Sequence, residues 1–245
     1  MPELTMKSRA EFLSAMKDVL FATGKPESYR KVADWATAHG NAELSSAALE
    51  AAGDVDEAEA DFNRMCIGPY RLSVPPYESV WRASGRMLNN RFSAAVEHSY
   101  AELGLTVSRS LNEPCDFFAY EIEFMYCAAA LAATNEDAGE TENAAALVEM
   151  FNRFWAEHLG HWAVKFLSAL EDDARHPFWR AWAHELNARL SDFTVGIALS
   201  NHMTGVEAIV APPASKTEKR IQNEKAFLFL RPVARLACRW RSANR

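Results

Sequence analysis

The sequence predicts an all-α fold, a single compact helical domain of about nine or more helices followed by a basic C-terminal tail. Apolar residues recur at three- and four-residue spacing along most of the chain, as they do on the buried face of a helix. The sequence has no sustained alternation of apolar and polar residues and no Asn-Gly or Asp-Gly hairpin signal. Its 245 residues are 49% hydrophobic and 24% charged, a composition typical of a globular chain with a sizeable core.

Proline and glycine delimit the predicted helices of the first half. Gly24-Lys25-Pro26 ends the first helix, because proline lacks an N–H group and restricts the residue before it. Gly53-Asp54 and Gly104 mark two further helix ends. We therefore expect helices over residues 6–22, 28–39, 42–52, 57–65 and 86–103.

In the second half, Pro114 fits a first helical turn, where its missing N–H costs nothing, and Asp116 there complements the helix dipole. The clearest amphipathic stripe runs from Leu147 to Phe166. We expect helices over 114–133, 142–172 and 177 to about 195, and a further helical segment at 196–210. Residues 135–141 form a polar linker and a candidate hinge, and the domain 1–211 ends where the tail 212–245 begins.

Cysteine usage and hydropathy indicate the compartment. Cys66, Cys115, Cys127 and Cys238 form no Cys-x-x-Cys pair, so we expect reduced thiols rather than a disulfide framework or a zinc ribbon. The N-terminus lacks a basic region followed by an apolar one, and no window reaches the roughly 18 apolar residues of a membrane helix. We expect a cytoplasmic protein with no cofactor and no stable membrane insertion.

Charge is unevenly distributed along the chain. The tail 212–245 has nine basic and two acidic residues, or +7, whereas the rest has 17 basic and 31 acidic residues, or −14. Such a body repels nucleic acid and favours a cationic partner. The tail contains a short apolar run with basic flanks at 225–231, which suggests that it occupies an acidic groove when no partner is bound. The alternative, which we favour, is a disordered or peripherally docked tail.

A proline-stiffened loop follows the helix at 57–65. Gly68-Pro69 and Pro75-Pro76 restrict its backbone, so Tyr70, Leu72 and Tyr77 are held in place before any ligand arrives. Two interpretations are open at this point. These side chains line a binding site, or they pin the loop to the core.

The segment around Pro114 combines acids with aromatic residues. Glu113 and Asp116 lie about one helical turn apart, and Tyr120 continues the same face. Carboxylates beside aromatic surface are suited to hold an arginine by bidentate pairing and stacking. The alternative is a helix capped by acids with its aromatic side chains buried.

Two histidines three residues apart, His158 and His161, are candidate metal ligands. No third ligand stands at a fixed spacing from them. We therefore expect a packed or hydrogen-bonded His158 and a surface His161.

These three segments, in this order, resemble the TorD-like family of cytoplasmic chaperones, also called redox enzyme maturation proteins (TorD, DmsD and NarJ types). The resemblance covers roughly residues 6–193. The matching motifs are Gly68-Pro69, Pro75-Pro76-Tyr77-Glu78-Ser79-Val80, Glu113-Pro114-Cys115-Asp116, and the run Phe154, His158-Leu159, Trp162 and Phe166. The tail lies outside the resemblance.

The resemblance implies a chaperone rather than an enzyme. Family members bind the twin-arginine signal peptide of a molybdenum-containing, molybdopterin-dependent oxidoreductase. They hold the apo-enzyme for cofactor insertion before export or assembly. The implied partners are that signal peptide and the apo-enzyme, no nucleic acid is expected, and a homodimer remains open.

The family pattern also implies a peptide-binding groove between the proline-stiffened loop and the start of the Pro114 helix. Glu113 and Asp116 would pair with the arginines. Phe117 stands where many relatives have histidine, which makes the site more apolar. The full candidate set is Tyr70, Leu72, Pro76, Tyr77, Glu113, Pro114, Asp116, Phe117 and Tyr120.

Two neighbours of this set receive structural expectations. Ser79 is expected to cap the helix after Pro76. Glu78 is either a further anionic contact or, as we favour, a solvated side chain.

Three other functions remain as alternatives. One is a general helical scaffold that binds partners through an apolar face. A second is a metal- or haem-binding helical protein that uses His158, His161 and His184. A third is a helical regulator whose tail binds DNA, although no helix-turn-helix pattern is evident at either terminus.

Overall fold

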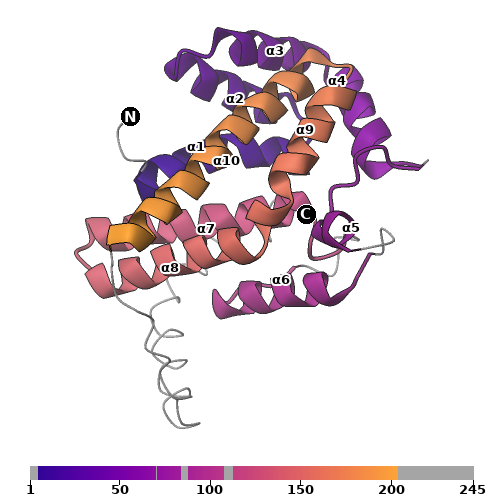
Figure 1. Cartoon of the computed structure of the whole chain (residues 1–245). Helices are drawn as coiled ribbons and strands as arrows, with labels where there is room; N and C mark the ends of the chain where they lie inside the picture. The colour runs from indigo at the N-terminus through magenta and orange to yellow at the C-terminus, as the bar shows by residue number, and fades with distance from the viewer. Residues whose placement is uncertain (1–4, 70, 84–87, 108–112, 204–245) are drawn as a thin grey trace.

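The computed structural model describes residues 5–69, 71–83, 88–107 and 113–203, with side chains to residue 193. Within these ranges the chain is all-α, as predicted, and an isolated bridge between Tyr77 and Phe117 is its only β-pairing (Figure 1). The α-helices are α1 (Met6–Phe21), α2 (Pro26–Ala38), α3 (Ala42–Gly53), α4 (Val55–Phe62), α5 (Glu78–Arg82), α6 (Arg91–Glu102), α7 (Phe118–Asp137), α8 (Thr141–Glu157), α9 (Ala163–Asp173) and α10 (Pro177–Met203).

Several helices begin at the capping residues that their sequences provide. The Asn41 side chain accepts a hydrogen bond from Leu44 N at 3.0 Å, and the Thr5 hydroxyl accepts one from Ser8 N at 3.2 Å. Each bond satisfies a backbone donor that the first helical turn leaves without a partner. Pro26 occupies the first turn of α2. This position explains why the boundary between the first two helices could be predicted at residues 24–26.

The helix α10 ties the two halves of the molecule together. It runs diagonally across the view in Figure 1, packing on α9, α3 and α4, and its Phe193 ring lies 5.5 Å from that of Phe151 in α8. The remaining strong helix pairs are α2 with α3, α1 with α7, and α7 with α8. The start of α7 therefore lies at a junction between α1, α8 and the loop before α5.

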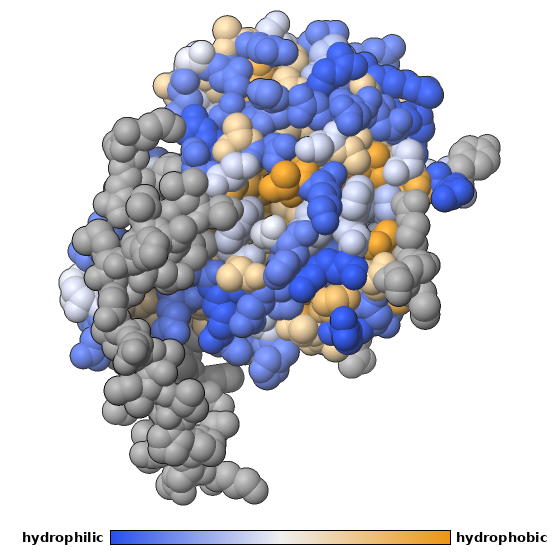
Figure 2. Space-filling model, viewed as in Figure 1, coloured by the Kyte–Doolittle hydropathy of each residue, from blue (hydrophilic) through white to orange (hydrophobic). Residues whose placement is uncertain are grey.

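Large aromatic side chains fill the core. Trp162, Trp179 and Trp182 are fully buried, and the indole N–H of Trp179 donates to Ala58 O at 2.7 Å. Each large ring removes about 150–250 Å² of surface from water, so these side chains dominate the burial energy. The face shown in Figure 2 is mostly hydrophilic, with apolar side chains in small separate groups.

The prediction of one helix over 142–172 is wrong in one respect, because the helix is interrupted at His158. The helix α8 ends at Glu157, a short 3₁₀ turn covers Leu159–His161, and α9 starts at Ala163. His158 leaves helical geometry and turns its ring to a buried carboxylate. Gly160 permits the break, because a Cβ at this position would lie 2.7 Å from Trp155 O.

The other helix of the second half is displaced from its predicted range. The predicted helix 114–133 instead spans Phe118–Asp137, because Pro114 O closes a turn with Phe117 N and Phe117 pairs with Tyr77. Gly139, at φ +78°, forms the tight turn into α8. Residues 135–137 are thus helical, and the hinge at 135–141 stays a prediction.

The remaining boundaries agree with the sequence to within a few residues. The helix predicted at 57–65 is α4 followed by a π-helical turn, Asn63–Ile67, that ends at Gly68 with φ +110°. The helix predicted from 177 continues to Met203 and so includes part of the segment 196–210. The tail 212–245 lies outside the described residues, and the domain limit at 211 stays a prediction. Among the described helices, none combines the length with the hydropathy that a membrane span requires.

Candidate peptide-binding site

The two segments that the sequence singles out lie side by side. Phe118 N donates to Pro76 O at 2.9 Å, and Glu78 N donates to Asp116 O at 3.1 Å. On its other side the loop contacts the π-helical turn, where Val74 N donates to Met65 O at 3.0 Å. The proline-stiffened loop is therefore fixed by backbone hydrogen bonds against the start of α7.

Four aromatic rings form a continuous row across this junction. The ring centroids of Tyr77 and Phe117 are 5.8 Å apart, those of Phe117 and Tyr120 are 5.3 Å apart, and those of Tyr120 and Phe21 are 5.9 Å apart. These separations suit favourable aromatic pairs. We call Tyr77, Phe117, Tyr120 and Phe21 the aromatic row. Three of its rings are buried, whereas Phe21 at the end of α1 is 38% exposed.

Glu113 borders the row with a half-buried carboxylate. The Tyr77 hydroxyl donates to Glu113 Oε2 at 2.6 Å. Burial and the neighbouring Glu113 raise the pKa of Tyr77 well above its usual range, and the same two causes raise the pKa of Tyr120 to about 12. Both phenols therefore stay neutral, and Glu113 carries the negative charge at this edge.

Asp116 occupies a different environment only three residues later. It is fully buried, and its Oδ2 accepts from Ser79 N at 2.8 Å while its Oδ1 accepts from the Ser93 hydroxyl at 2.9 Å. Both carboxylate oxygens are thus engaged inside the protein. Asp116 joins α5 and α6 to the start of α7, and in this conformation it does not face a ligand.

The expectation that Ser79 caps the helix after Pro76 is wrong. The N-cap of α5 is Tyr77, and the buried hydroxyl of Ser79 has no hydrogen-bond partner among the described residues. Asp116 satisfies the backbone N–H of Ser79 instead. A carboxylate distant in the sequence has taken over the capping role.

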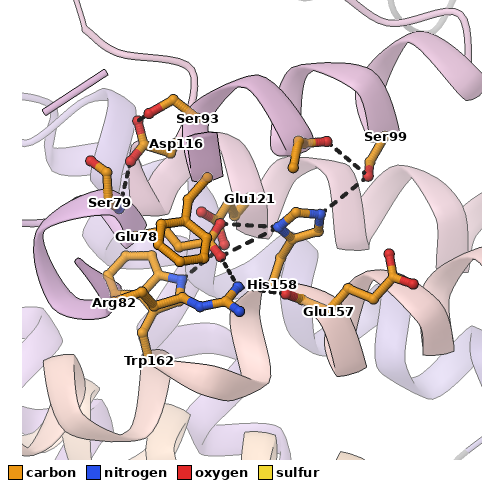
Figure 3. A network of polar contacts seen from close by, with 12 residues as sticks. Glu78, Ser79, Arg82, Ser93, Ser99, Asp116, Glu121, Glu157, His158 and Trp162 are labelled. Atoms are coloured by element: carbon orange, nitrogen blue, oxygen red, sulfur yellow. Dashed lines mark hydrogen bonds and ion pairs between the residues drawn. The ribbon is translucent and has the colours of Figure 1, made fainter. Parts of the chain in front are cut away.

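A set of polar side chains, Glu78, Arg82, Glu121, His158 and Trp162, meets at one place in the fold, and we call it the buried network (Figure 3). All of them are buried except Arg82, whose side chain is 20% exposed. The expectation of a solvated Glu78 is wrong, because Glu78 has no exposed surface. Arg82 donates to Glu78, and His158 Nδ1 lies 3.1 Å from Glu78 Oε2. The prediction of a hydrogen-bonded His158 and an exposed His161 is confirmed.

Glu121 adds a second carboxyl group to the network. It is fully buried and its Oε2 accepts from Trp162 Nε1 at 3.1 Å, whereas Oε1 has no ordinary donor among the described residues. Burial and the charges of Glu78 and Asp116 raise the pKa of Glu121 well above its usual range. This environment therefore favours the neutral, protonated form of Glu121.

The network locks α5 onto the break between α8 and α9. Arg82 also donates to Glu157 O, and the Ser99 hydroxyl lies 3.3 Å from His158 Nε2. These contacts hold α5, and with it the loop that carries Tyr77, at a fixed position relative to α7. The sequence did not predict the burial of Glu121 or the pairing of Glu78 with His158, because both depend on contacts between residues that are distant in the sequence.

The structure places the other predicted residues as follows. Pro76 is buried, Leu72 packs on the core with part of its surface exposed, and Pro114 is half-buried. Tyr70 lies outside the described residues. Tyr77, Glu113, Phe117 and Tyr120 thus come together as predicted neighbours, and Phe21 joins them without having been predicted.

The described residues also bear on a metal-binding function. They contain no group of three or more His, Cys, Asp and Glu side chains placed to hold a metal ion. His158 contacts Glu78, and His184 Nδ1 lies 3.0 Å from Glu171 Oε1 at the surface.

Comparison with known proteins gives a family match. The sequence model of the nitrate reductase delta subunit family matches residues 32–168, more than half of the chain. The chain is 32% identical over 120 residues to the Tat proofreading chaperone DmsD of Salmonella typhimurium, with 49% of this chain and 52% of that protein covered. These findings confirm the resemblance to the TorD-like chaperones.

Two further relatives carry chaperone names. The chain is 26% identical over 130 residues to the chaperone protein TorD of Aliivibrio salmonicida, with 53% of this chain and 59% of that protein covered. It is 29% identical over 135 residues to the chaperone protein YcdY of Escherichia coli, with 55% and 62% covered. The chain spans about half the length of the curated relatives that it matches.

Proposed function

Since the chain belongs to the nitrate reductase delta subunit family, we propose that it is a cytoplasmic chaperone and not an enzyme. It binds the twin-arginine signal peptide of a molybdenum-containing oxidoreductase. It holds the apo-enzyme until the molybdenum cofactor is inserted, before export or assembly. The names of the relatives, Tat proofreading chaperone and chaperone protein, support this proposal.

The observation that carries the proposal is the half-buried carboxylate of Glu113 at the edge of the aromatic row. A guanidinium group pairs with a carboxylate through two parallel hydrogen bonds and stacks on aromatic rings. Glu113 offers its free oxygen next to Tyr77 and Tyr120, so one site provides both interactions.

The charge of the body supports the same ligand. Residues 1–211 carry −14, which attracts a peptide with adjacent arginines and raises its rate of association at low salt. Leu72, a partly exposed residue of the loop that packs on the core, adds apolar surface for the hydrophobic stretch that follows the arginines. The peptide is thus recognised by charge at one point and by apolar contact along its length.

Asp116 has a positioning role in this proposal rather than a direct one. Its two internal hydrogen bonds fix the start of α5, and the buried network fixes the end of α5. The part of the loop at residues 71–76 is thereby held before a peptide arrives, which lowers the entropy cost of binding.

Titration calorimetry of the full chain with a twin-arginine peptide tests the proposal. The peptide is the signal sequence of a molybdoenzyme encoded beside this protein, and the matched peptide has Lys-Lys in place of Arg-Arg. We expect micromolar or tighter binding of the first peptide and at least tenfold weaker binding of the second, because ammonium groups cannot pair bidentately. Equal affinity for both would support the general scaffold instead.

A further inference from the structure

Phe21 presents an aromatic ring to solvent beside the candidate site. It is the last residue of α1 and is 38% exposed. Its ring stacks on Tyr120 with the centroids 5.9 Å apart and the planes 26° apart. The exposed part of such a ring is a surface on which a guanidinium group stacks.

Glu59 lies against the chain that follows Phe21. The Thr23 hydroxyl donates to Glu59 Oε1 at 2.7 Å. A Cβ atom on Gly24 would lie 3.1 Å from Glu59 Oε2, so this carboxylate rests directly on the turn between α1 and α2. Glu59 comes from α4, and its half-buried carboxylate is therefore placed at the Phe21 end of the aromatic row.

Neither Glu59 nor Glu113 forms an ion pair within the described residues. Each instead accepts a hydrogen bond from a neutral hydroxyl, that of Thr23 or of Tyr77. Other half-buried acids of the fold do have cationic partners, as Glu123 has with Lys17 at 2.8 Å. A half-buried carboxylate without a cation is stabilised when a guanidinium group arrives.

From these contacts we propose that the aromatic row has two arginine sites, one at Glu113 beside Tyr120 and a second at Glu59 beside Phe21. The occupant is an extended cationic peptide with two adjacent arginines, so this inference rests on the function proposed above. The contact that places Glu59 near this end of the row is its hydrogen bond with the hydroxyl of Thr23, two residues after Phe21.

An extended peptide can present adjacent side chains to two different sites. In an extended peptide, successive side chains point to opposite sides of the backbone. A backbone laid over the Tyr120–Phe21 stack would then direct one arginine to Glu113 and the next to Glu59. This arrangement predicts that two adjacent arginines, rather than one, are needed for full affinity.

A double-mutant cycle by calorimetry tests the second site. The full-length chain and its Glu59→Gln and Glu113→Gln variants are titrated with the twin-arginine peptide. They are also titrated with two peptides in which either arginine is replaced by citrulline, its neutral analogue. We expect each variant to bind the unaltered peptide about tenfold more weakly. Each variant should also become insensitive to citrulline at one arginine position only, a different position for each variant.

Two further variants serve as controls. Phe21→Leu keeps apolar bulk and removes the ring, and should weaken binding roughly two- to fivefold. Glu57→Gln removes an exposed charge two residues from Glu59 and should leave the affinity within about twofold.

The outcomes separate this inference from the proposed function. If the unaltered chain binds the peptide but Glu59→Gln and Phe21→Leu bind as tightly, the second site is refuted and the chaperone proposal stands. If the unaltered chain does not bind the peptide, both are refuted. Coupling of both arginines to Glu113 alone would also overturn the two-site arrangement.

Discussion

Glu113 and Asp116 are three residues apart, yet they belong to different regions of the molecule. Glu113 is half-buried, has one hydroxyl donor and borders the aromatic row. Asp116 is fully buried and its two oxygens accept hydrogen bonds from two other helices. The same type of side chain thus holds the fold together in one region and, in the proposed function, offers a charge to a ligand in the other.

The difference follows from what surrounds each carboxylate. A buried charge is tolerated only when internal donors replace water, and Asp116 and Glu78 have such donors. At the aromatic row the donors are few and water or a ligand supplies the rest. Substitutions in the buried network should therefore change stability, and those at the row should change binding.

The largest effect is expected from Glu78→Gln. This substitution removes the charge that pairs with Arg82 and His158 and leaves Arg82 without its buried partner. We expect a loss of about 3–5 kcal/mol in the free energy of unfolding, measured by urea denaturation. A loss below about 1 kcal/mol would show that the network does not stabilise the fold.

A somewhat smaller loss is expected from Asp116→Ala. The buried donors Ser79 N and Ser93 Oγ would lose their acceptor, which costs about 2–4 kcal/mol in the free energy of unfolding. Asp116→Asn retains an acceptor oxygen and should recover part of this loss. Equal losses for both variants would contradict the assigned hydrogen bonds.

Glu121 predicts a dependence of stability on pH. The pKa of Glu121 is raised in the folded state above its ordinary value of 4.5, so its contribution to stability is complete below about pH 4.5 and is lost as pH rises through the folded-state value. The free energy of unfolding of the unaltered chain should fall by at most about 1.4 kcal/mol for each unit by which the pH rises over this window.

Glu121→Gln provides the matched comparison for that prediction. Its neutral amide cannot ionise, so the variant should gain stability relative to the unaltered chain as pH rises from 5 to 8. Urea denaturation of both proteins at these pH values measures the difference. A difference that stays constant with pH would mean that Glu121 is ionised in the folded protein.

The smallest effect on stability is expected at the row. Glu113→Gln keeps an oxygen that accepts from the Tyr77 hydroxyl, so the free energy of unfolding should change by less than about 1 kcal/mol. The same urea denaturation measures it. A loss comparable to that of Asp116→Ala would place Glu113 with the structural carboxylates.

The sequence was informative about those features of the structure that arise from interactions within short segments. The apolar periodicity of α1 to α4 and the prolines at 26, 114 and 177 predict the all-α fold and most helix boundaries. The two motifs around Tyr77 and Glu113 predict neighbours that the structure brings together. These features depend on propensities and spacings that short segments carry by themselves.

Contacts between distant segments could not be predicted in this way. His158 continues the apolar stripe of α8, so the periodicity runs through the helix break at which His158 contacts Glu78, 80 residues earlier. Asp116 has the sequence features of a first-turn acid and is buried because Ser79 and Ser93 meet it in three dimensions. Phe21 ends an amphipathic helix, and only the packing of α1 on α7 places it at the site.

The most direct test of the division between the two regions is the affinity of Glu113→Gln for the twin-arginine peptide, compared by calorimetry with that of Glu57→Gln. Both variants lose one negative charge from the same acidic body. We expect about tenfold weaker binding for Glu113→Gln, with stability retained, and nearly unchanged binding for Glu57→Gln. Equal affinities for the two variants would contradict the proposal that the half-buried carboxylate of Glu113 binds the peptide.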